Sequence, residues 1–439
     1  MTPAARERAG RPRWPNPWWI PPFLGRVPAI EPHLVRLLGL VALALFFEQY
    51  DQSMLTSALK YIATDLGMTE SELGGYLGLI RLGALPAFLV VPFADRIGRR
   101  RVFLLSVLGI SVGTCLTAFT RTAAEFVAAQ MATRTFVLTG AAAAFVIVTE
   151  EFPAEHRGWG IGILGALGAC GHGLGAALFA AIDVLPYGWR ALYAVGVVPL
   201  FLLPVFARGI PETQRFSRHR ADRRDDAGGV ASWFRPIAAL ARTHPSRAAG
   251  LALAAGLVSV GEVSVYQFTG YYTQTARGWS PGQFATLVIL GGAVGIIGHV
   301  VAGRLGDRIG RRTVGAIFLG VFPVFAWLFY MGPDGWTVPV AWILFVFCGT
   351  AGDVVIRALS TELFPTSHRG TSAGWLSLVQ TVGWAAGLAL LGAWTHAPGD
   401  LPRLTSAMSV GVLLGGLALF VLPETHRREL EAISHERPA

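Results

Sequence analysis

Seven charged side chains stand out because they lie inside long apolar stretches of the chain. In chain order they are Glu48, Asp51, Arg81, Arg134, Glu262, Asp353 and Arg357. A charge at the centre of a bilayer costs roughly 2.5–3.5 kcal/mol on insertion scales, so each one needs a partner, a watery path or a function. If these stretches cross a membrane, the chemistry they favour is proton transfer and ion recognition.

The first acidic pair is suited to carrying a proton. Glu48 and Asp51 are three residues apart and would share one face of a helix. Two carboxylates this close in a medium of low dielectric constant resist being ionised together, which favours uptake of a proton. A static ion-pair network, with Arg81 or Arg134 as the counter-ion, is the alternative. Glu262 presents the same choice between proton coupling and a structural role.

The remaining intramembrane polar groups are candidates for contact with a solute. Asp353 and Arg357 are four residues apart, so they can also pair with each other on one helix face. The full set of predicted solute contacts is Arg81, Arg134, Tyr266, Tyr271, Asp353, Arg357, Gln380 and Trp384.

Composition sets the class of protein that must position these groups. Of the 439 residues, 53% are hydrophobic and 14% are charged, whereas a soluble domain carries about 25% charged residues. These values exclude a disordered chain and disfavour a soluble multi-domain protein. They predict an all-α integral membrane protein, because a spanning segment must satisfy its own backbone.

Twelve apolar runs approach the roughly 20 residues that a transmembrane helix needs. They lie at about 34–57, 73–94, 101–120, 125–149, 158–181, 189–208, 247–271, 283–303, 312–331, 338–359, 370–394 and 403–422. Short linkers between them make neighbouring helices antiparallel.

The basic residues predict the orientation of these helices. Placing the N-terminus in the cytoplasm puts 28 of the 36 Lys and Arg residues on that side, five on the other side and three within spans. This asymmetry predicts a multi-pass protein of the inner (plasma) membrane with both termini cytoplasmic. The net charge of +9 then reflects topology and contact with the lipid bilayer, and nucleic-acid binding loses its main support. The three cysteines show neither metal-ligand spacing nor a disulfide framework.

An internal repeat divides the chain in two. Three segments recur at one common offset, the one that separates Asp95 from Asp307: Asp95–Arg100 as Asp307–Arg312, Glu150–Gly158 as Glu362–Gly370, and Pro211–Thr213 as Pro423–Thr425. The repeat predicts two parallel six-helix halves related by an axis along the membrane normal. The predicted boundaries are a cytoplasmic tail at 1–33, a first half at 34–208, a cytoplasmic loop at 209–246, a second half at 247–422 and a cytoplasmic tail at 423–439.

These motifs resemble those of the major facilitator superfamily, over essentially the whole chain from Leu34 onward. The family motif G-x-L-x-D-R-x-G-R-R is complete in Gly303–Arg312, while the first copy has Val91 and Phe93 at its start. The resemblance implies two pseudo-symmetric six-helix bundles and a cytoplasmic gate between them. The predicted gate residues are Asp95, Arg96, Arg99, Glu150, Arg157, Asp307, Arg308, Arg311, Glu362 and Arg369. The alternative is that these charges only set topology.

Several branches of the family share features with this chain. Both Pro-Glu-Thr segments and Tyr271-Tyr272 are similar to sugar porters, whereas Tyr50-Asp51 looks like bacterial symporters of organic acids. Glycines around His172 resemble an antiporter motif, but His172 replaces its proline. The expected function is alternating-access, proton-coupled symport of a small organic anion or polar metabolite. A sugar or polyol porter, a drug/proton antiporter and a non-transporting solute sensor are the alternatives.

Other roles have less support in the sequence. The sequence shows no phosphate-binding loop, nucleophile constellation or metal cluster that would indicate an enzyme. We therefore expect no cofactor, partners limited to the solute, protons and lipid, and a monomer.

Overall fold

The computed structural model describes residues 17, 19–20, 27–28, 30–90, 97–153, 155–213, 231–365, 368–397 and 399–426. Within these ranges, twelve helical segments are long and apolar enough to cross a membrane, and no strand occurs. The twelve predicted spans are confirmed, with ends that differ from the prediction by a few residues. The predicted tails at 1–33 and 423–439 lie largely outside the described residues.

In the described residues, eight helices form the first six spans, because the second and the sixth spans are interrupted, and the short helix α3 follows the first span. The helices are α2 (Pro32–Ser57), α3 (Leu59–Asp65), α4 (Glu70–Leu82), α5 (Ala87–Val90), α7 (Arg99–Ala118), α8 (Ala123–Glu151), α9 (Arg157–Phe179), α10 (Trp189–Ala194) and α11 (Val197–Gly209).

A helix that belongs to no span precedes the last six. The elements are α13 (Ala231–Thr243), α14 (Pro245–Gln267), α15 (Thr269–Thr275), α16 (Pro281–Ile309), α17 (Arg311–Met331), α18 (Thr337–Glu362), α19 (Arg369–Trp394), α20 (Asp400–Met408), α21 (Val410–Ala418) and the 3-10 helix η4 (Leu419–Val421).

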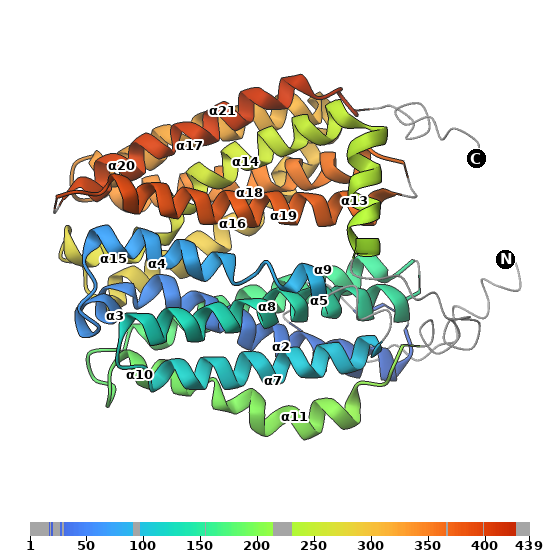
Figure 1. The fold of residues 1–439 in the computed structure, drawn as a ribbon, viewed down its shortest axis with the longest axis horizontal. Helices are drawn as coiled ribbons and strands as arrows, with labels where there is room; N and C mark the ends of the chain where they lie inside the picture. The colour runs from blue at the N-terminus through green and yellow to red at the C-terminus, as the bar shows by residue number, and fades with distance from the viewer. Residues whose placement is uncertain are drawn as a thin grey trace, which may run out of the picture.

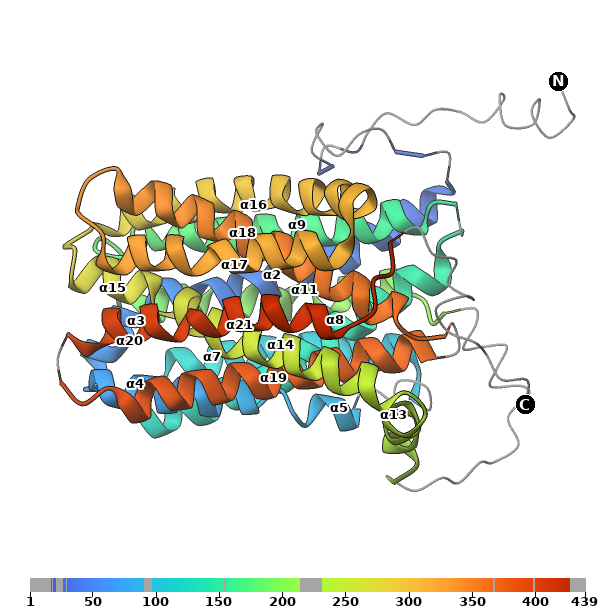
Figure 2. The same ribbon diagram turned by 90° about the horizontal axis from the view of Figure 1, so that it is seen from above.

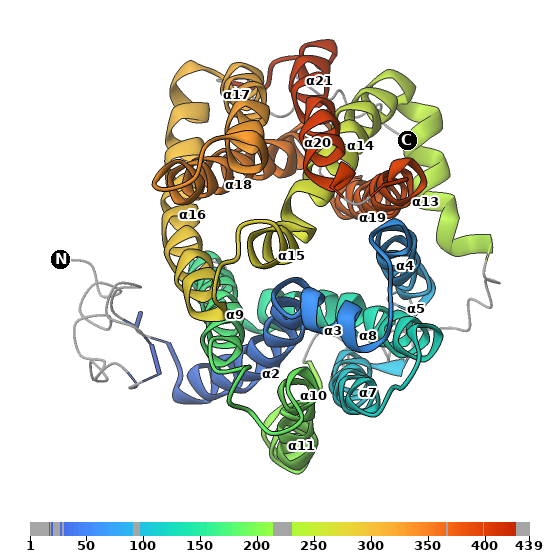
Figure 3. The same cartoon turned by 90° about the vertical axis from the view of Figure 1, so that its left-hand side faces the viewer.

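The helices form two groups that lie one above the other in Figure 1, with α2–α11 below and α14–α21 above. We call these groups the first half and the second half. The residue boundaries predicted for the halves from the sequence stay predictions. The end of the bundle that carries Arg99 and Arg311 is called the motif end, and α13 lies across it (Figures 1 and 2). The opposite end, with α3 and α15, is called the far end. Viewed along the bundle from the far end, the helices of each half surround a central region (Figure 3).

Glycines bring the central helices of each half into close contact. A Cβ atom on Gly171 of α9 would lie 1.9 Å from the Phe46 carbonyl oxygen of α2. The equivalent Gly383 of α19 packs on Ser259 of α14, where a Cβ atom would lie 2.8 Å from the Ser259 Cβ. Gly171, one of the glycines that resembled an antiporter motif in the sequence, therefore serves the packing of α9 against α2.

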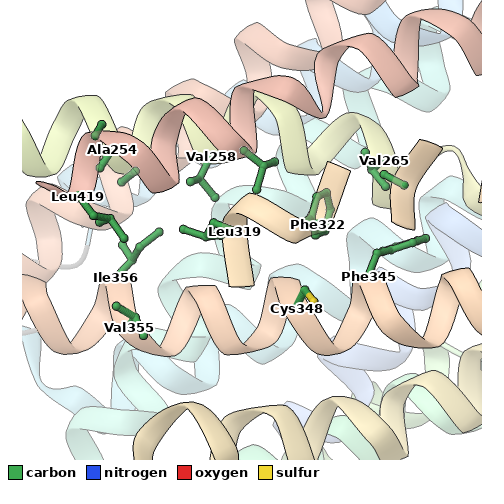
Figure 4. Packing of buried hydrophobic residues seen from close by; sticks show 14 of the residues in the cluster. Ala254, Val258, Val265, Leu319, Phe322, Phe345, Cys348, Val355, Ile356 and Leu419 are labelled. Carbon is green, nitrogen blue, oxygen red and sulfur yellow. The ribbon is translucent and has the colours of Figure 1, made fainter. Parts of the chain in front are cut away.

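Buried apolar side chains hold the second half together. Phe322 and Leu319 of α17 pack against Phe345 of α18 and Val258 of α14 (Figure 4). The first half has its own cluster of buried side chains on α2, α7, α8 and α9. A further cluster spans both halves, where Phe179 of α9 packs against Phe284 of α16. Apolar packing therefore holds each half together and also joins the two halves.

Two interrupted spans matter for function. The second span bends after Leu82, where Gly83 approaches the Met131 backbone so closely that a Cβ atom would lie 2.4 Å from its carbonyl oxygen. The seventh span is interrupted at Phe268, between α14 and α15. Broken helices inside a membrane are tolerated where they line a polar region, and they often position ligand-binding groups.

Candidate functional site

The acidic pair of the first half is deeply buried on α2. Glu48 is 3% exposed and Asp51 is 1% exposed. The Thr114 hydroxyl of α7 donates a 2.8 Å hydrogen bond to Asp51 Oδ1, while Asp51 Oδ2 is buried and has no partner in the described part of the chain. Because a buried carboxylate oxygen without a donor is costly, this atom is a natural place for a proton.

Arg134 of α8 is the counter-ion of this pair. Its side chain is buried, and its charge acts on both Glu48 and Asp51. Its Nη1 donates to Gln52 Oε1 at 2.8 Å, and no ion pair within 4.0 Å involves it among the described residues. The sequence left Arg81 and Arg134 open as counter-ions, and the structure brings only Arg134 to the acids.

Arg81 instead reaches across to the second half. Its Nη2 donates to Gln267 Oε1 at 3.0 Å, and its guanidinium carbon lies 5.6 Å from the ring centroid of Trp384. Gln267 was not among the predicted site residues.

The polar cluster of the second half lies on α14, α18 and α19. Arg357 Nε lies 2.6 Å from Asp353 Oδ2, which confirms that the two can pair, and Gln380 Nε2 donates to Asp353 Oδ1 at 3.3 Å. Glu262 lies within the electrostatic reach of both charges. The second half therefore gathers two acids around one arginine.

The two predicted tyrosines lie in different surroundings. Tyr266 packs against Phe322 and Phe345 in the apolar core, with its hydroxyl 3.4 Å from the Phe345 carbonyl oxygen. Tyr271 lies at the far end, where its hydroxyl donates to Glu70 Oε1 at 3.2 Å. Tyr266 thus borders the Glu262 cluster, and Tyr271 joins the two halves.

At the motif end, the predicted gate residues form one cluster in each half. In the first half, Arg99 Nη2 lies 3.1 Å from Glu150 Oε1. In the second half, Arg311 Nη2 lies 3.2 Å from Glu362 Oε1 and 2.8 Å from Asp307 Oδ1. Each of these ion pairs joins residues of the same half.

The other predicted gate residues contribute less to these clusters. Asp95 and Arg96 lie outside the described residues. Arg308 forms no ion pair within the described ranges. The Nε atoms of Arg157 and Arg369 are buried and without a hydrogen-bond partner there.

The Pro-Glu-Thr segments complete both clusters, a role that the sequence analysis missed. Glu212 accepts a hydrogen bond from the backbone N–H of Arg100 at 3.1 Å, and the Thr213 hydroxyl donates to Glu150 Oε2 at 2.6 Å. In the second half, Glu424 Oε1 accepts from the Arg311 N–H at 3.0 Å, and the Thr425 hydroxyl donates to Glu362 Oε2 at 2.6 Å. Acids at helix N-termini are favourable. The offset that these segments share with the other repeated motifs was the signal that could have linked them.

The far end, in contrast, is joined across the halves. Lys60 Nζ donates to the Gln274 carbonyl at 3.0 Å, and Gln274 Nε2 donates to the Ser57 carbonyl at 3.1 Å. Glu70 accepts from Tyr271 and, at 3.3 Å, from the Gly399 N–H. Between α4 and α19, a Cβ atom on Gly74 would meet the Gly392 nitrogen at 2.4 Å. The two halves therefore meet closely at this end.

Twelve spans in two facing groups, with charges between them, define a polytopic membrane carrier. The sequence profile described as Major Facilitator Superfamily matches residues 41–388 and, in a second alignment, 251–438. The chain belongs to this superfamily of transporters, which confirms the resemblance noted in the sequence.

Individual relatives are distant but match along most of the chain. The cis,cis-muconate transport protein of Acinetobacter baylyi is 25% identical, over 86% of this chain and 90% of its own length. The gallate transporter of Pseudomonas putida is also 25% identical, over 91% of this chain and 94% of its own length. Among solved structures, a D-xylose-proton symporter aligns with a TM-score of 0.71 and 18% identity, covering 90% of this chain and 99% of its own. This last likeness concerns the fold alone.

Proposed function

We propose that this chain is a proton-coupled symporter that moves a small organic anion by alternating access. The similar proteins named for muconate and gallate support the choice of cargo, because both of those molecules are carboxylates. The intramembrane arginines of this chain suit such a cargo, since a guanidinium binds a carboxylate through two parallel hydrogen bonds.

The single observation that carries the proposal is the buried group of Asp51, Glu48 and Arg134. With both acids ionised, the group of Glu48, Asp51 and Arg134 carries one net negative charge, which repels an anion. When Asp51 Oδ2 takes up a proton, the group becomes neutral and this repulsion is lost, which favours an anion nearby. Proton and anion therefore bind together, which is the requirement for symport. Glu262, with Asp353 and Arg357, is a further candidate for proton coupling in the second half.

The contacts at the two ends support a carrier open at the motif end. The far end is closed by bonds between Lys60 and Gln274 and between Glu70 and Tyr271, whereas the ion pairs of the motif end stay within each half. With the predicted orientation in the plasma membrane, the open end faces the cytoplasm. Rocking of the halves would then close the motif end through the predicted gate residues.

Uptake into proteoliposomes tests the proposal. The purified protein should accumulate at least one of cis,cis-muconate, gallate or 4-hydroxybenzoate when the lumen is made alkaline, and it should not accumulate glucose. Asp51→Asn should lose accumulation and keep exchange of labelled for unlabelled acid. Asp65→Asn is the matched control, because Asp65 pairs with Arg190 in the described far end and plays no part in the buried group.

Each other outcome contradicts a named part of the proposal. Accumulation of glucose without any acid would favour the sugar porter. Exchange of an acid with equal pH dependence in the wild-type protein and in Asp51→Asn would refute coupling through Asp51. Absence of any flux across acids, sugars and cationic drugs would favour the sensor.

A further inference from the structure

Arg81 is a buried cation whose surroundings supply no negative charge. It lies in the last turn of α4, before the bend at Gly83, and its guanidinium contacts the second half. Its polar partner is the neutral amide of Gln267, and its ring partner is Trp384. In the described part of the chain Arg81 forms no ion pair, and the charge that acts on it is the like charge of Arg134.

Such a setting leaves the guanidinium short of partners. A cation inside a membrane protein is normally balanced by an acid or by water. A single bond from Nη2 to an amide, with one aromatic face, uses only part of the five donors of an arginine. A carboxylate placed against the Trp384 side of Arg81 would supply both the missing charge and a second hydrogen bond.

Gln267 forms a second hydrogen bond to the first half, besides the one to Arg81. Its Nε2 donates to Thr56 Oγ1 of α2 at 3.4 Å, and its side chain is 2% exposed. One amide therefore links α14, at its junction with α15, to both α4 and α2. The contact between Arg81 and Gln267 is part of the closure of the far end.

We propose that Arg81 is the anchoring site for the carboxylate of the cargo, which displaces Gln267 from the guanidinium. A carboxylate can accept two parallel hydrogen bonds from a guanidinium and neutralises its charge, whereas the neutral Gln267 amide accepts a single hydrogen bond from Arg81, so a carboxylate outcompetes the amide. Loss of Gln267 removes one of the bonds that join the halves at the far end. Binding of the anion and release of the far end are thus linked through a single side chain. This inference rests on the proposed function and specifies its binding site.

Equilibrium binding without a proton gradient tests the site separately from coupling. Titration calorimetry with 4-hydroxybenzoate, cis,cis-muconate and gallate, and with neutral 4-hydroxybenzamide, should show binding of an acid and not of the amide. Arg81→Met should weaken binding by about tenfold or more, because each 1.4 kcal/mol of lost binding is a factor of ten. Arg81→Lys should also weaken binding, since lysine keeps the charge and loses the paired donors.

Two substitutions at Gln267 test whether the cargo carboxylate displaces Gln267 from Arg81 or only binds near it. Gln267→Glu places a resident carboxylate on Arg81 and should abolish binding of the acid. Gln267→Leu removes the competitor and should tighten binding. Glu70→Ala is the matched control, because it removes far-end contacts with Tyr271 and Gly399 without touching Arg81, and it should change binding less than either substitution of Gln267. A monodisperse elution profile for each variant guards against misfolding.

The results that overturn the inference are distinct from those that overturn the transport proposal. If the wild-type protein accumulates an acid and Arg81→Met binds it equally well, the site is wrong and the transport proposal stands. Weaker binding by Gln267→Leu would make Gln267 a direct ligand and refute displacement. If the wild-type protein binds none of the acids, the site and the organic-anion cargo both fail.

Discussion

The two halves are built from the same parts at the motif end and from different charges inside the membrane. Gly98 and Gly310 adopt φ of 110° and 108° and precede helices capped by Glu212 and Glu424. The threonine-to-glutamate bond of each cluster measures 2.6 Å in both halves. Equivalent residues of the two halves thus repeat even the geometry of their side chains.

Inside the membrane the repeat breaks down. At the offset that relates Asp95 to Asp307, the residues Glu48, Asp51 and Arg134 correspond to Val260, Val263 and Val346, and Asp353 and Arg357 correspond to Ala141 and Phe145. A carrier needs both halves to move in the same way, which favours repeated parts at the motif end. Binding a proton and an asymmetric solute needs different chemistry from each half. We therefore expect the repeated clusters to serve movement and the unrepeated charges to serve recognition.

The largest expected difference between the halves concerns two equivalent glycines. Gly171→Ala would place a Cβ atom 1.9 Å from a backbone oxygen of α2, so α9 must move away from α2. Gly383→Ala meets the Ser259 Cβ at 2.8 Å and the Gly256 carbonyl oxygen at 3.2 Å, so a smaller shift relieves the overlap. Overpacking costs about 1–3 kcal/mol, and we expect thermal unfolding in detergent to show a fall of several degrees for Gly171→Ala and a smaller one for Gly383→Ala.

Gly165, a helical glycine with open space beside its Cα atom, provides the control for this pair. A Cβ atom on Gly165 of α9 finds no neighbour within 4 Å, so Gly165→Ala should keep or slightly raise the unfolding temperature through its better helix propensity. Equal losses for Gly171→Ala and Gly383→Ala would show that the halves pack with the same tightness.

A smaller effect should separate the gate role of Asp307 from a structural one. The Asp307 side chain is 67% exposed, whereas that of Glu362 is 24% exposed, and both pair with Arg311. Exposed ion pairs contribute about 0–1 kcal/mol to stability. Asp307→Asn should therefore keep the unfolding temperature and slow transport in liposomes, while Glu362→Gln should lower that temperature as well, because it also loses the bond from Thr425.

Unchanged turnover of Asp307→Asn would contradict the gate hypothesis and leave Asp307 with a role in topology only. Glu150→Gln extends the comparison to the first half. Because the arginine and threonine partners of Glu150 are equivalent to those of Glu362, the two glutamine variants should lose stability to the same degree.

The fold was predictable from the sequence because the bilayer imposes simple rules. Span length, apolar composition and the internal repeat located all twelve membrane spans found in the described residues. The clusters of the motif end were predictable in position, since Glu150 and Arg99 belong to repeated motifs. Their completion by Thr213 was missed, because that segment was considered as part of the repeat and as a sign of family branch, and not as a partner of the gate residues.

The polar groups between the halves were predictable as residues and not as contacts. Nothing in the local sequence of Arg81 points to Gln267, which lies 186 residues away. That contact depends on how the halves pack against each other and on the break at the end of α14. The choice of Arg134 as counter-ion similarly required the relative positions of α2, α4 and α8.

The smallest expected difference concerns the first helical turns of the two halves. α14 follows His244, whose ring packs edge-on against Phe364 and His368, with ring centroids 6.0 and 6.4 Å apart. Burial, together with the positive charges of Arg247 and His368, holds the pKa of His244 below its usual value of 6.5. Just below pH 6.5, His244 therefore binds fewer protons in the folded protein than in the unfolded chain. The stability of the junction between α13 and α14 falls as the pH drops from 6.5 towards the lowered pKa of His244. α2 instead follows Glu31, an acid that suits a helix N-terminus.

Hydrogen exchange measures this difference directly. Amides at the junction of α13 and α14 should exchange faster at pH 5.5 than at pH 7.5, after correction for the intrinsic rate, and amides at the start of α2 should not. His244→Asn removes the titratable ring and places a residue type that is favoured at helix N-caps, so it should remove most of the acid effect. An undiminished acid effect in that variant would assign it to another group, and equal acid effects at both starts would remove this contrast between the halves.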